Sequence, residues 1–391
     1  MKISRDSIVS RINDVLPEVI ELRHALHKFP ELAGKEVKTR EVLISLIAPY
    51  VPVIWQPKLG TDLVFELPGR DPGRVIGFRC DMDGLPIQES PLLPYASEHT
   101  GVMHACGHDG HMAILIGAVL VLSGIQEMLP CTIRCIFQPG EEEACMGAEL
   151  VEKGVCDGLE RIYGYHNWPG LPTGAISTKP GILFASANTF TGTITGTATH
   201  GATPERGNNP LIPASAAAVQ IDDLHRRLQQ NEEGVASVCM IRGGRNTNTI
   251  PETATIAGTI RYTDATVGNR IAAEIQEIFQ GLEEKYDVIV DLVYDRSYYL
   301  PVVNDAAAVE SVEHAVNTYM GDGVYIPAER HTMASEDFSF YLQQIPGCMF
   351  LLGTGVDSPP LHAVNYDFND DALMHGVLLL VSLALEDVLA D

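Results

Sequence analysis

The chain has 391 residues, of which 46% are hydrophobic and 20% charged, and its formal net charge at pH 7 is -25. This length favours two domains over one, and the composition is that of a globular protein with enough apolar residues for a core. The strongly acidic charge excludes nucleic acid as an expected partner, because a phosphate backbone would be repelled.

Targeting and membrane signals are weak in this sequence. No apolar stretch follows the positively charged start M-K-I-S-R, and the most apolar segment, Met112–Leu122, is shorter than the roughly 20 residues that span a bilayer. The eight cysteines lack the spacing of a disulfide framework. We therefore expect a cytoplasmic protein with reduced thiols and no membrane partner.

The first part of the chain alternates helical and extended patterns, as βαβ architecture does. Apolar residues at helical spacing predict a helix over Ser4–His27. Three apolar strands follow, each directly succeeded by Asp, Glu or His. Ligands of open α/β sheets bind beyond the carboxyl ends of the strands, so these clusters indicate a site there. The strands are predicted over Val75–Phe78, Thr132–Phe137 and Ile162–Tyr165, with a helix over Met112–Ser123.

From about Phe184 the sequence becomes rich in Thr, Gly and Ala. After Pro301 the α/β pattern resumes, with a strand over Cys348–Leu352 and a helix over Asp370–Leu389. We predict a discontinuous α/β domain over 1–184 and 300–391, with a mixed sheet and helices on both faces. An inserted α+β domain over 185–299 has the order β-α-β-β-α-β of a ferredoxin-like fold. Its elements are predicted over Asn188–Gly196, Pro210–Gln230, Ala236–Ile241, Glu252–Tyr262, Thr266–Glu284 and Val288–Tyr294.

The loop M-H-A-C-G-H-D-G-H, from Met103 to His111, is the densest cluster of possible metal ligands. Cys106 and His108 are two residues apart, so they reach one ion only from a loop or extended segment, which the glycines favour. Thiolate and imidazole suit a borderline-soft divalent ion such as zinc. A buried cysteine beside a capping histidine is the commoner explanation of C-x-H alone, but three histidines, a Cys and an Asp in this loop favour a metal site.

Glu141 and Glu142 follow the second strand directly through a Pro-Gly pair. A run of Glu is usually a solvated loop, but carboxylates at the end of a buried strand are unfavourable without a cation. One of them could bind a metal that lowers the pKa of water while the other takes the proton, which is the pair of roles that hydrolysis needs. Further candidates are the ligands His166 and His362 and three carboxylates that could orient imidazoles, Asp81, Asp83 and Asp109.

Eight motifs occur in one order along the chain: R-C-D-M-D-G-L-P, M-H-A-C-G-H-D-G-H, F-Q-P-G-E-E, G-Y-H-N-W-P, T-H-G-A-T-P, N-T-I-P, S-E-D-F and P-L-H. The series closely resembles the aminoacylase/hippurate hydrolase branch of the dinuclear metallopeptidase clan. That clan also contains carboxypeptidases and succinyl-diaminopimelate desuccinylase. The resemblance extends from L-H-K-F-P-E-L near residue 30 to the C-terminal helix.

The resemblance implies a site with two divalent metal ions per subunit, Zn or Mn, with Co or Ni as replacements in vitro. Glu141 matches the general base of the family, and Asp83 matches an orienting carboxylate. The implied ligands are Cys106 as a bridge, His108 and His166 for one ion, and Glu142 and His362 for the other.

In the insert, the resemblance implies that His200 reaches the active site of a partner subunit and polarises the scissile carbonyl. Asn248 and Arg261 match lid positions that bind the substrate carboxylate. The family insert closes as a lid and also dimerises, so we expect a homodimer or higher homo-oligomer. The segment T-H-G-A-T-P-E-R departs from the family pattern, which has more glycine before the His and a His after the Pro.

The implied function is hydrolysis of the amide bond of small N-acyl amino acids, hippurate-like or N-acetylated, to a carboxylate and the free amino acid. Glu141 would deprotonate the attacking water and return the proton to the leaving amine. A dipeptidase or carboxypeptidase of the same clan uses identical chemistry, so the sequence leaves that alternative open. A non-catalytic metal-stabilised binding protein is disfavoured, because the base and all five candidate ligands are present.

Overall fold

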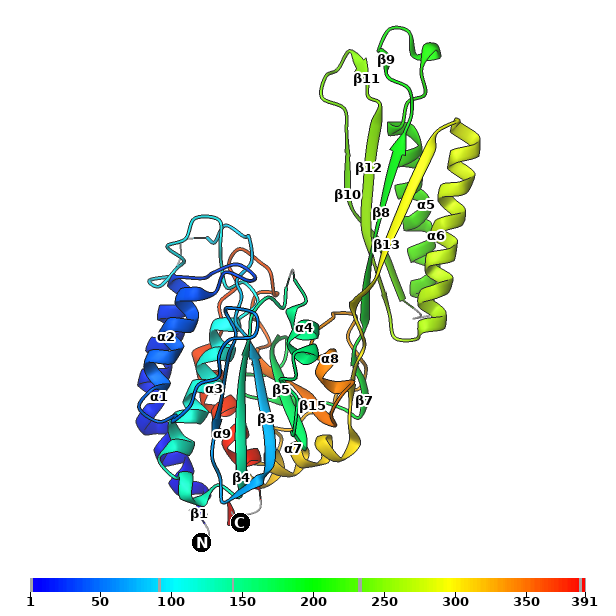
Figure 1. Ribbon diagram of the computed structural model, residues 1–391. Coiled ribbons are helices and arrows are strands. Elements are labelled where there is room, and N and C mark those ends of the chain that lie inside the picture. Colours follow the sequence, from blue (N-terminus) through cyan, green and yellow to red (C-terminus); the bar gives the residue numbers. More distant parts are fainter. Residues whose placement is uncertain (1–2, 91–92, 143, 231–233, 387–388, 391) are drawn as a thin grey trace. The chain divides into compact units, whose positions relative to one another are not determined.

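The computed structural model describes residues 3–90, 93–142, 144–230, 234–386 and 389–390. Contacts within the chain divide it into two compact units, whose elements are labelled in Figure 1. The second unit is inserted into the first, so the first is built from distant parts of the chain. The first comprises Met1–Leu183, Val303–Arg330 and Asp337–Asp391, and the second comprises Phe184–Val302 and His331–Glu336.

A six-stranded sheet in the order β2-β4-β3-β5-β15-β6 forms the centre of the first unit. The four middle strands run parallel, and the edge strands β2 and β6 are antiparallel to their neighbours, which confirms the predicted mixed sheet. Every residue of β4 is buried, as in a strand that is covered on both faces. The strands are β2 (Leu63–Leu67), β3 (Asp71–Asp81), β4 (Cys131–Gln138), β5 (Arg161–Pro169), β6 (Ile176–Ser177) and β15 (Gly347–Gly355).

Three helices of the first unit pack against one another: α1 (Arg5–Lys28), α3 (His108–Ser123) and α9 (Leu373–Ala384). Gly117 of α3 permits this close approach, because a Cβ atom there would lie 2.7 Å from a methyl group of Val377. Further α-helices and short strands are α2 (Val37–Ile47), α4 (Met146–Glu152), α7 (Ala306–Tyr319), α8 (Ser339–Leu342), β1 (Ile3–Ser4), β7 (Gly181–Phe184), β14 (Val302–Asn304) and β16 (Leu389–Ala390).

The second unit is an antiparallel sheet in the order β10-β12-β8-β13, with two helices packed on it around a separate apolar core. This arrangement confirms the predicted ferredoxin-like order of elements. Two short strands, β9 (Thr199–His200) and β11 (Thr249–Ile250), pair with each other in an antiparallel ladder. In the chain, β9 comes after the sheet strand β8, and β11 comes before the sheet strand β12. The main elements are β8 (Ser186–Thr195), α5 (Leu211–Gln230), β10 (Gly234–Gly243), β12 (Thr253–Tyr262), α6 (Ala265–Tyr286) and β13 (Ile289–Tyr299).

Two predicted helices, Met112–Ser123 and Asp370–Leu389, differ most from the helices of the structure. α3 begins at His108 rather than Met112, because Gly107 adopts a left-handed φ of 83° and the helix starts immediately after it. The C-terminal helix α9 begins at Leu373, after a 3-10 turn over Asp370–Ala372, and ends at Ala384; residues 387–388 of the predicted helix lie outside the described residues. In the part of the chain that the structure describes, no helix combines the length and apolar character needed to cross a bilayer.

Candidate metal centre

The candidate site lies at the carboxyl ends of three adjacent parallel strands, β4, β3 and β5. Asp81 is the last residue of β3, and Asp83 follows it closely. Glu141 and Glu142 come shortly after β4, whereas His166 lies inside β5 rather than beyond its end. The sheet order therefore brings together the polar clusters that follow the three predicted strands.

Two loops outside these strands complete the cluster. Gly107 precedes His108, and a Cβ atom at this glycine would lie only 2.6 Å from Asn167 Oδ1, so a larger residue does not fit. His362 has a left-handed φ of 65°, which is uncommon for a residue other than glycine. Its backbone N–H donates to the carbonyl oxygen of Ala105 at 2.8 Å, which ties the loop of His362 to the cysteine loop.

The five candidate ligands form two groups that share Cys106. Within each group the potential ligand atoms all lie within 4.8 Å of one another. Cys106 Sγ is 3.4 Å from His166 Nε2, and Glu142 Oε1 is 3.1 Å from His362 Nε2. Thiolate, imidazole and carboxylate are ligands of zinc and related divalent ions. One group is Cys106, His108 and His166, and the other is Cys106, Glu142 and His362.

The chemistry of the cluster fits divalent cations. His108 Nε2 is buried and forms no hydrogen bond with the described residues. Burial raises the pKa of the Cys106 thiol well above its usual value, and the charges of Glu142 and Glu141 raise it further. A divalent cation reverses this preference because it stabilises the thiolate. An imidazole nitrogen without a hydrogen bond, beside a thiol and two carboxylates, is a donor set that suits divalent metal ions.

Asp83 links the histidine and glutamate segments. Its carboxylate accepts hydrogen bonds from the backbone N–H groups of Glu141 at 3.1 Å and Glu142 at 3.0 Å. Asp83 Oδ1 also lies 3.3 Å from His108 Nδ1. Burial by itself lowers the pKa of His108, but the charges of Asp81 and Asp83 outweigh burial and raise it to about 10. Both carboxylates lie on the Nδ1 side of His108, at 3.7 Å for Asp81 and 3.3 Å for Asp83.

A hydrogen-bonded chain fixes the tautomer of His166. His111 Nδ1 lies 2.6 Å from Asp81 Oδ1, and His111 Nε2 accepts from the backbone N–H of Asn167 at 3.0 Å. His166 Nδ1 in turn donates to the carbonyl oxygen of Asn167 at 2.7 Å, so its Nε2 lone pair faces Cys106. Burial lowers the pKa of His166 to about 3 and keeps the ring in the neutral form that binds metals.

Asp109 does not orient a candidate ligand, contrary to the expectation from sequence. Its carboxylate instead lies 3.3 Å from Arg23 Nη1 and 2.9 Å from His27 Nδ1, both on α1. His27 Nε2 also lies 3.2 Å from Glu89 Oε1. All these side chains are buried. Sequence reasoning missed this ion cluster, and the available signal was the spacing of Arg23 and His27, which places both on one helix face.

The three candidate residues of the insert lie in two places within the second unit. His200 and Asn248 meet where β9 pairs with β11, and the neighbouring Gly201 N–H donates to Asn248 O at 2.7 Å. Arg261 is next to the last residue of β12, so it lies at the end of the strand that is farther from β11. Arg261 Nη1 donates to Ser335 Oγ at 3.0 Å. Within this unit, Arg261 is therefore remote from His200 and Asn248.

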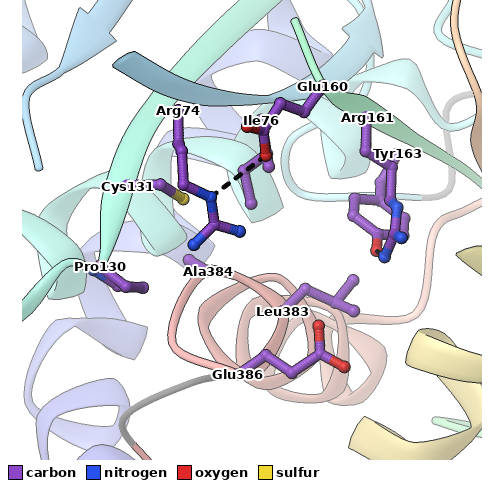
Figure 2. Close-up of a pocket in the computed structure, with 10 residues that line it drawn as sticks. All are labelled: Arg74, Ile76, Pro130, Cys131, Glu160, Arg161, Tyr163, Leu383, Ala384 and Glu386. Carbon is purple, nitrogen blue, oxygen red and sulfur yellow. Dashed lines mark hydrogen bonds and ion pairs between the residues drawn. The ribbon is translucent and has the colours of Figure 1, made fainter. Parts of the chain in front are cut away.

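A separate cavity of about 130 Å³ lies at the opposite, amino ends of β3, β4 and β5. Figure 2 shows the side chains that line it. Arg74 Nε lies 3.3 Å from Glu160 Oε2, and Arg161 Nη1 donates to Tyr163 Oη at 3.2 Å. None of the predicted catalytic or metal-binding residues is among those that line it. This cavity is therefore distinct from the candidate metal centre.

Known proteins resemble this chain over most of its length. N-acetyldiaminopimelate deacetylase of Lactiplantibacillus plantarum is 34% identical over 387 residues, covering 96% of this chain and 97% of the relative. N-acetyl-L-cysteine deacetylase of Bacillus subtilis is 33% identical over 341 residues, covering 87% and 81%. A similar solved structure is that of the Bacillus subtilis YXEP protein, a dinuclear metal-binding peptidase from the M20 family. Its TM-score to this chain is 0.79 and its sequence is 29% identical. The match covers 96% of this chain and 99% of that chain.

The family model for Peptidase family M20/M25/M40 matches residues 77–386, a range that includes every candidate ligand. The similarity in fold extends over both units. The relationship inferred from the ordered motifs is thereby confirmed: this chain belongs to Peptidase family M20/M25/M40.

Proposed function

We propose that this chain is a hydrolase that uses two divalent metal ions to cleave the amide bond of N-acyl amino acids. The observation that carries the proposal is the pair of ligand groups that share Cys106. The potential ligand atoms of Glu141, His108 and Glu142 also lie within 4.8 Å of one another. The relatives named as deacetylases of N-acetyldiaminopimelate and N-acetyl-L-cysteine support an N-acetyl amino acid as the substrate.

Cys106 would contribute to both ligand groups, with His108 and His166 holding one ion and Glu142 and His362 the other. Bound there, the ions would lower the pKa of a water molecule and polarise the scissile carbonyl. Glu141 then accepts a proton from the attacking water and returns it to the leaving amine. Asp83 holds the backbone of Glu141 and so sets the position from which the base acts. The thiol favours zinc, although manganese remains a second candidate for the native ion.

We propose that the first unit is the catalytic domain and the second a lid and dimerisation domain. Arg261 would bind the substrate carboxylate, because its guanidinium can form paired hydrogen bonds with a carboxylate. The eight residues of β12 that precede Arg261 span roughly 27 Å. This separation supports a division of roles in which His200 acts on the substrate of a partner subunit.

The function is tested by hydrolysis assays on protein purified without chelators. The substrates are acetyl amino acids, benzoyl-glycine and simple dipeptides, each with added Zn, Mn or Co. We expect release of free amino acids from the N-acyl substrates, together with about two bound ions per chain by elemental analysis. Faster cleavage of dipeptides would favour a peptidase instead. Inactivity of the fully metallated protein on the whole panel would reject the proposal.

The dimer is tested separately by light scattering. Mixing inactive His200→Ala chains with inactive Glu141→Gln chains should restore part of the activity if His200 acts across subunits. No recovery after exchange of subunits would reject that role for His200.

A further inference from the structure

Two buried carboxylates hold three successive backbone N–H groups in the loop after β4. Gly140 N donates to Glu36 Oε1 at 3.0 Å. Asp83 accepts from the next two backbone N–H groups, those of Glu141 at 3.1 Å and Glu142 at 3.0 Å. The loop that carries the proposed base is therefore held at consecutive positions by side chains from two other segments.

This loop needs such support because β4 ends at Gln138, and the following N–H groups have no partner in the strand ladder. Buried N–H groups that lose water require another acceptor. Gly140 is also in the left-handed region, with φ of 62°, and a Cβ atom there would lie 2.5 Å from Met146 Sδ. The left-handed conformation of Gly140 thus sets the direction in which the chain enters Glu141, and the hydrogen bond from Gly140 N to Glu36 stabilises that conformation.

Glu36 is well suited to hold this backbone. It is fully buried at the start of α2, and its carboxylate also accepts from Gly34 N at 3.0 Å and from Thr61 Oγ at 2.9 Å. Each of these contacts is with a donor, so the carboxylate acts throughout as an acceptor. Burial raises the pKa of Glu36 to about 7, and the nearby charge of Asp83 contributes. Burial disfavours the charged form of a carboxylate, so a buried Glu36 needs hydrogen-bond donors such as these to offset that cost.

We propose that Glu36 is a positioning residue for catalysis: by fixing Gly140, it works with Asp83 to aim Glu141 at the attacking water. The inference rests on the proposed function, since it assigns Glu36 to the same base. Glu36 acts through the backbone of the loop and does not itself touch the substrate or the reacting atoms.

The test compares Glu36→Gln with the matched control Glu31→Gln. Glu31 lies in the same segment and accepts from Thr39 N at 2.9 Å and Thr39 Oγ at 3.0 Å, both in α2. Glu36→Gln should lower kcat by about 10- to 100-fold, because an ångström of misplacement has effects of that order. KM and bound metal should stay near wild-type values. Glu31→Gln should leave kcat unchanged.

Hydrogen exchange supplies a readout besides activity. In Glu36→Gln, backbone exchange at residues 140–142 should become faster, while exchange in the helix α2 should match that of the control. Wild-type kcat in a folded Glu36→Gln variant, or an equal loss in Glu31→Gln, would overturn the inference. Loss of activity that merely follows loss of metal would overturn it as well.

Thr61→Val covers the case in which Glu36→Gln does not fold. It removes one donor to Glu36 and should lower kcat to a smaller extent, again without loss of metal. An unchanged kcat in this variant, with Glu36→Gln unfolded, would assign Glu36 to folding alone. If wild-type protein cleaves no N-acyl amino acid, the proposed function fails, whereas exchange at 140–142 still decides whether Glu36 holds the loop.

Discussion

The buried ion cluster of His27 and Asp109 predicts a pH dependence of stability. His27 is fully buried, with one ring nitrogen 2.9 Å from Asp109 and the other 3.2 Å from Glu89. Burial lowers the pKa of His27, but the two carboxylates outweigh it and raise the pKa from 6.5 to about 9. The charged imidazole is therefore favoured by the folded state more than by the unfolded chain.

The size of the effect follows from linkage. A rise from 6.5 to about 9, at about 1.4 kcal/mol for each pKa unit, gives about 3 kcal/mol of stability from protonated His27. Because the folded pKa is the higher one, this contribution is fully present below pH 6.5 and is lost as the pH rises through 9. His27→Gln cannot take up this proton, and Asp109 keeps its ion pair with Arg23 at 3.3 Å.

The assay is urea unfolding of wild-type protein and His27→Gln at several pH values between 6 and 10, after metal removal by chelator. Both tryptophans, Trp55 and Trp168, belong to the first unit, so their fluorescence reports on its unfolding. The free energy of unfolding of wild-type protein should fall by about 3 kcal/mol more than that of the variant. Parallel pH profiles for the two proteins would refute the reasoning.

Three further predictions concern the metal centre. Glu141→Gln should lower kcat by roughly 10²- to 10⁴-fold with metal content near wild type, and substantial remaining activity would rule out Glu141 as the base. Gly107→Ala should lower thermal stability and metal content, because its Cβ would lie 2.6 Å from Asn167 Oδ1; a wild-type melting profile would contradict the packing described. Cys106→Ser should reduce bound metal, measured by elemental analysis. Chelator should lower the melting temperature of wild-type protein more than that of Cys106→Ser, and equal shifts would argue against metal binding at the shared thiol.

Much of the fold was predictable because most helices and strands bury apolar residues at regular spacing. Periodicity fails where the buried residues are polar. The first turn of α3 contains His108, Asp109 and His111, all buried, so the helix begins before its apolar run. The opposite error occurs at the C-terminal helix, where Leu385 is buried but lies just after the end of α9. Its burial results from tertiary packing, which apolar spacing alone does not distinguish from a continuing helix.

The candidate site was predictable in its ligand types but not in its supporting contacts. Cysteine, histidine and glutamate in short motifs indicate metal chemistry directly. The residues that support them are far away in sequence: Glu36 and Gly140 are 104 positions apart. Arg79, whose guanidinium lies 3.0 Å from the carboxylate of Asp81, also donates at 2.7 Å to Asp337, 258 positions away. Tertiary packing of the sheet with its surrounding helices and loops brings such segments together, so no local pattern reveals them.

The discontinuity of the first unit affects the order of events during translation. β15 lies between β5 and β6 in the sheet, yet the ribosome releases it only after the whole second unit. A nascent chain therefore presents unpaired strand edges at β5 and β6 until that late segment emerges, and such edges invite aggregation. The loop of His362 follows β15, so the proposed metal centre also stays incomplete for most of synthesis. The second proposed ligand group therefore lacks His362 until the last part of the first unit has been made.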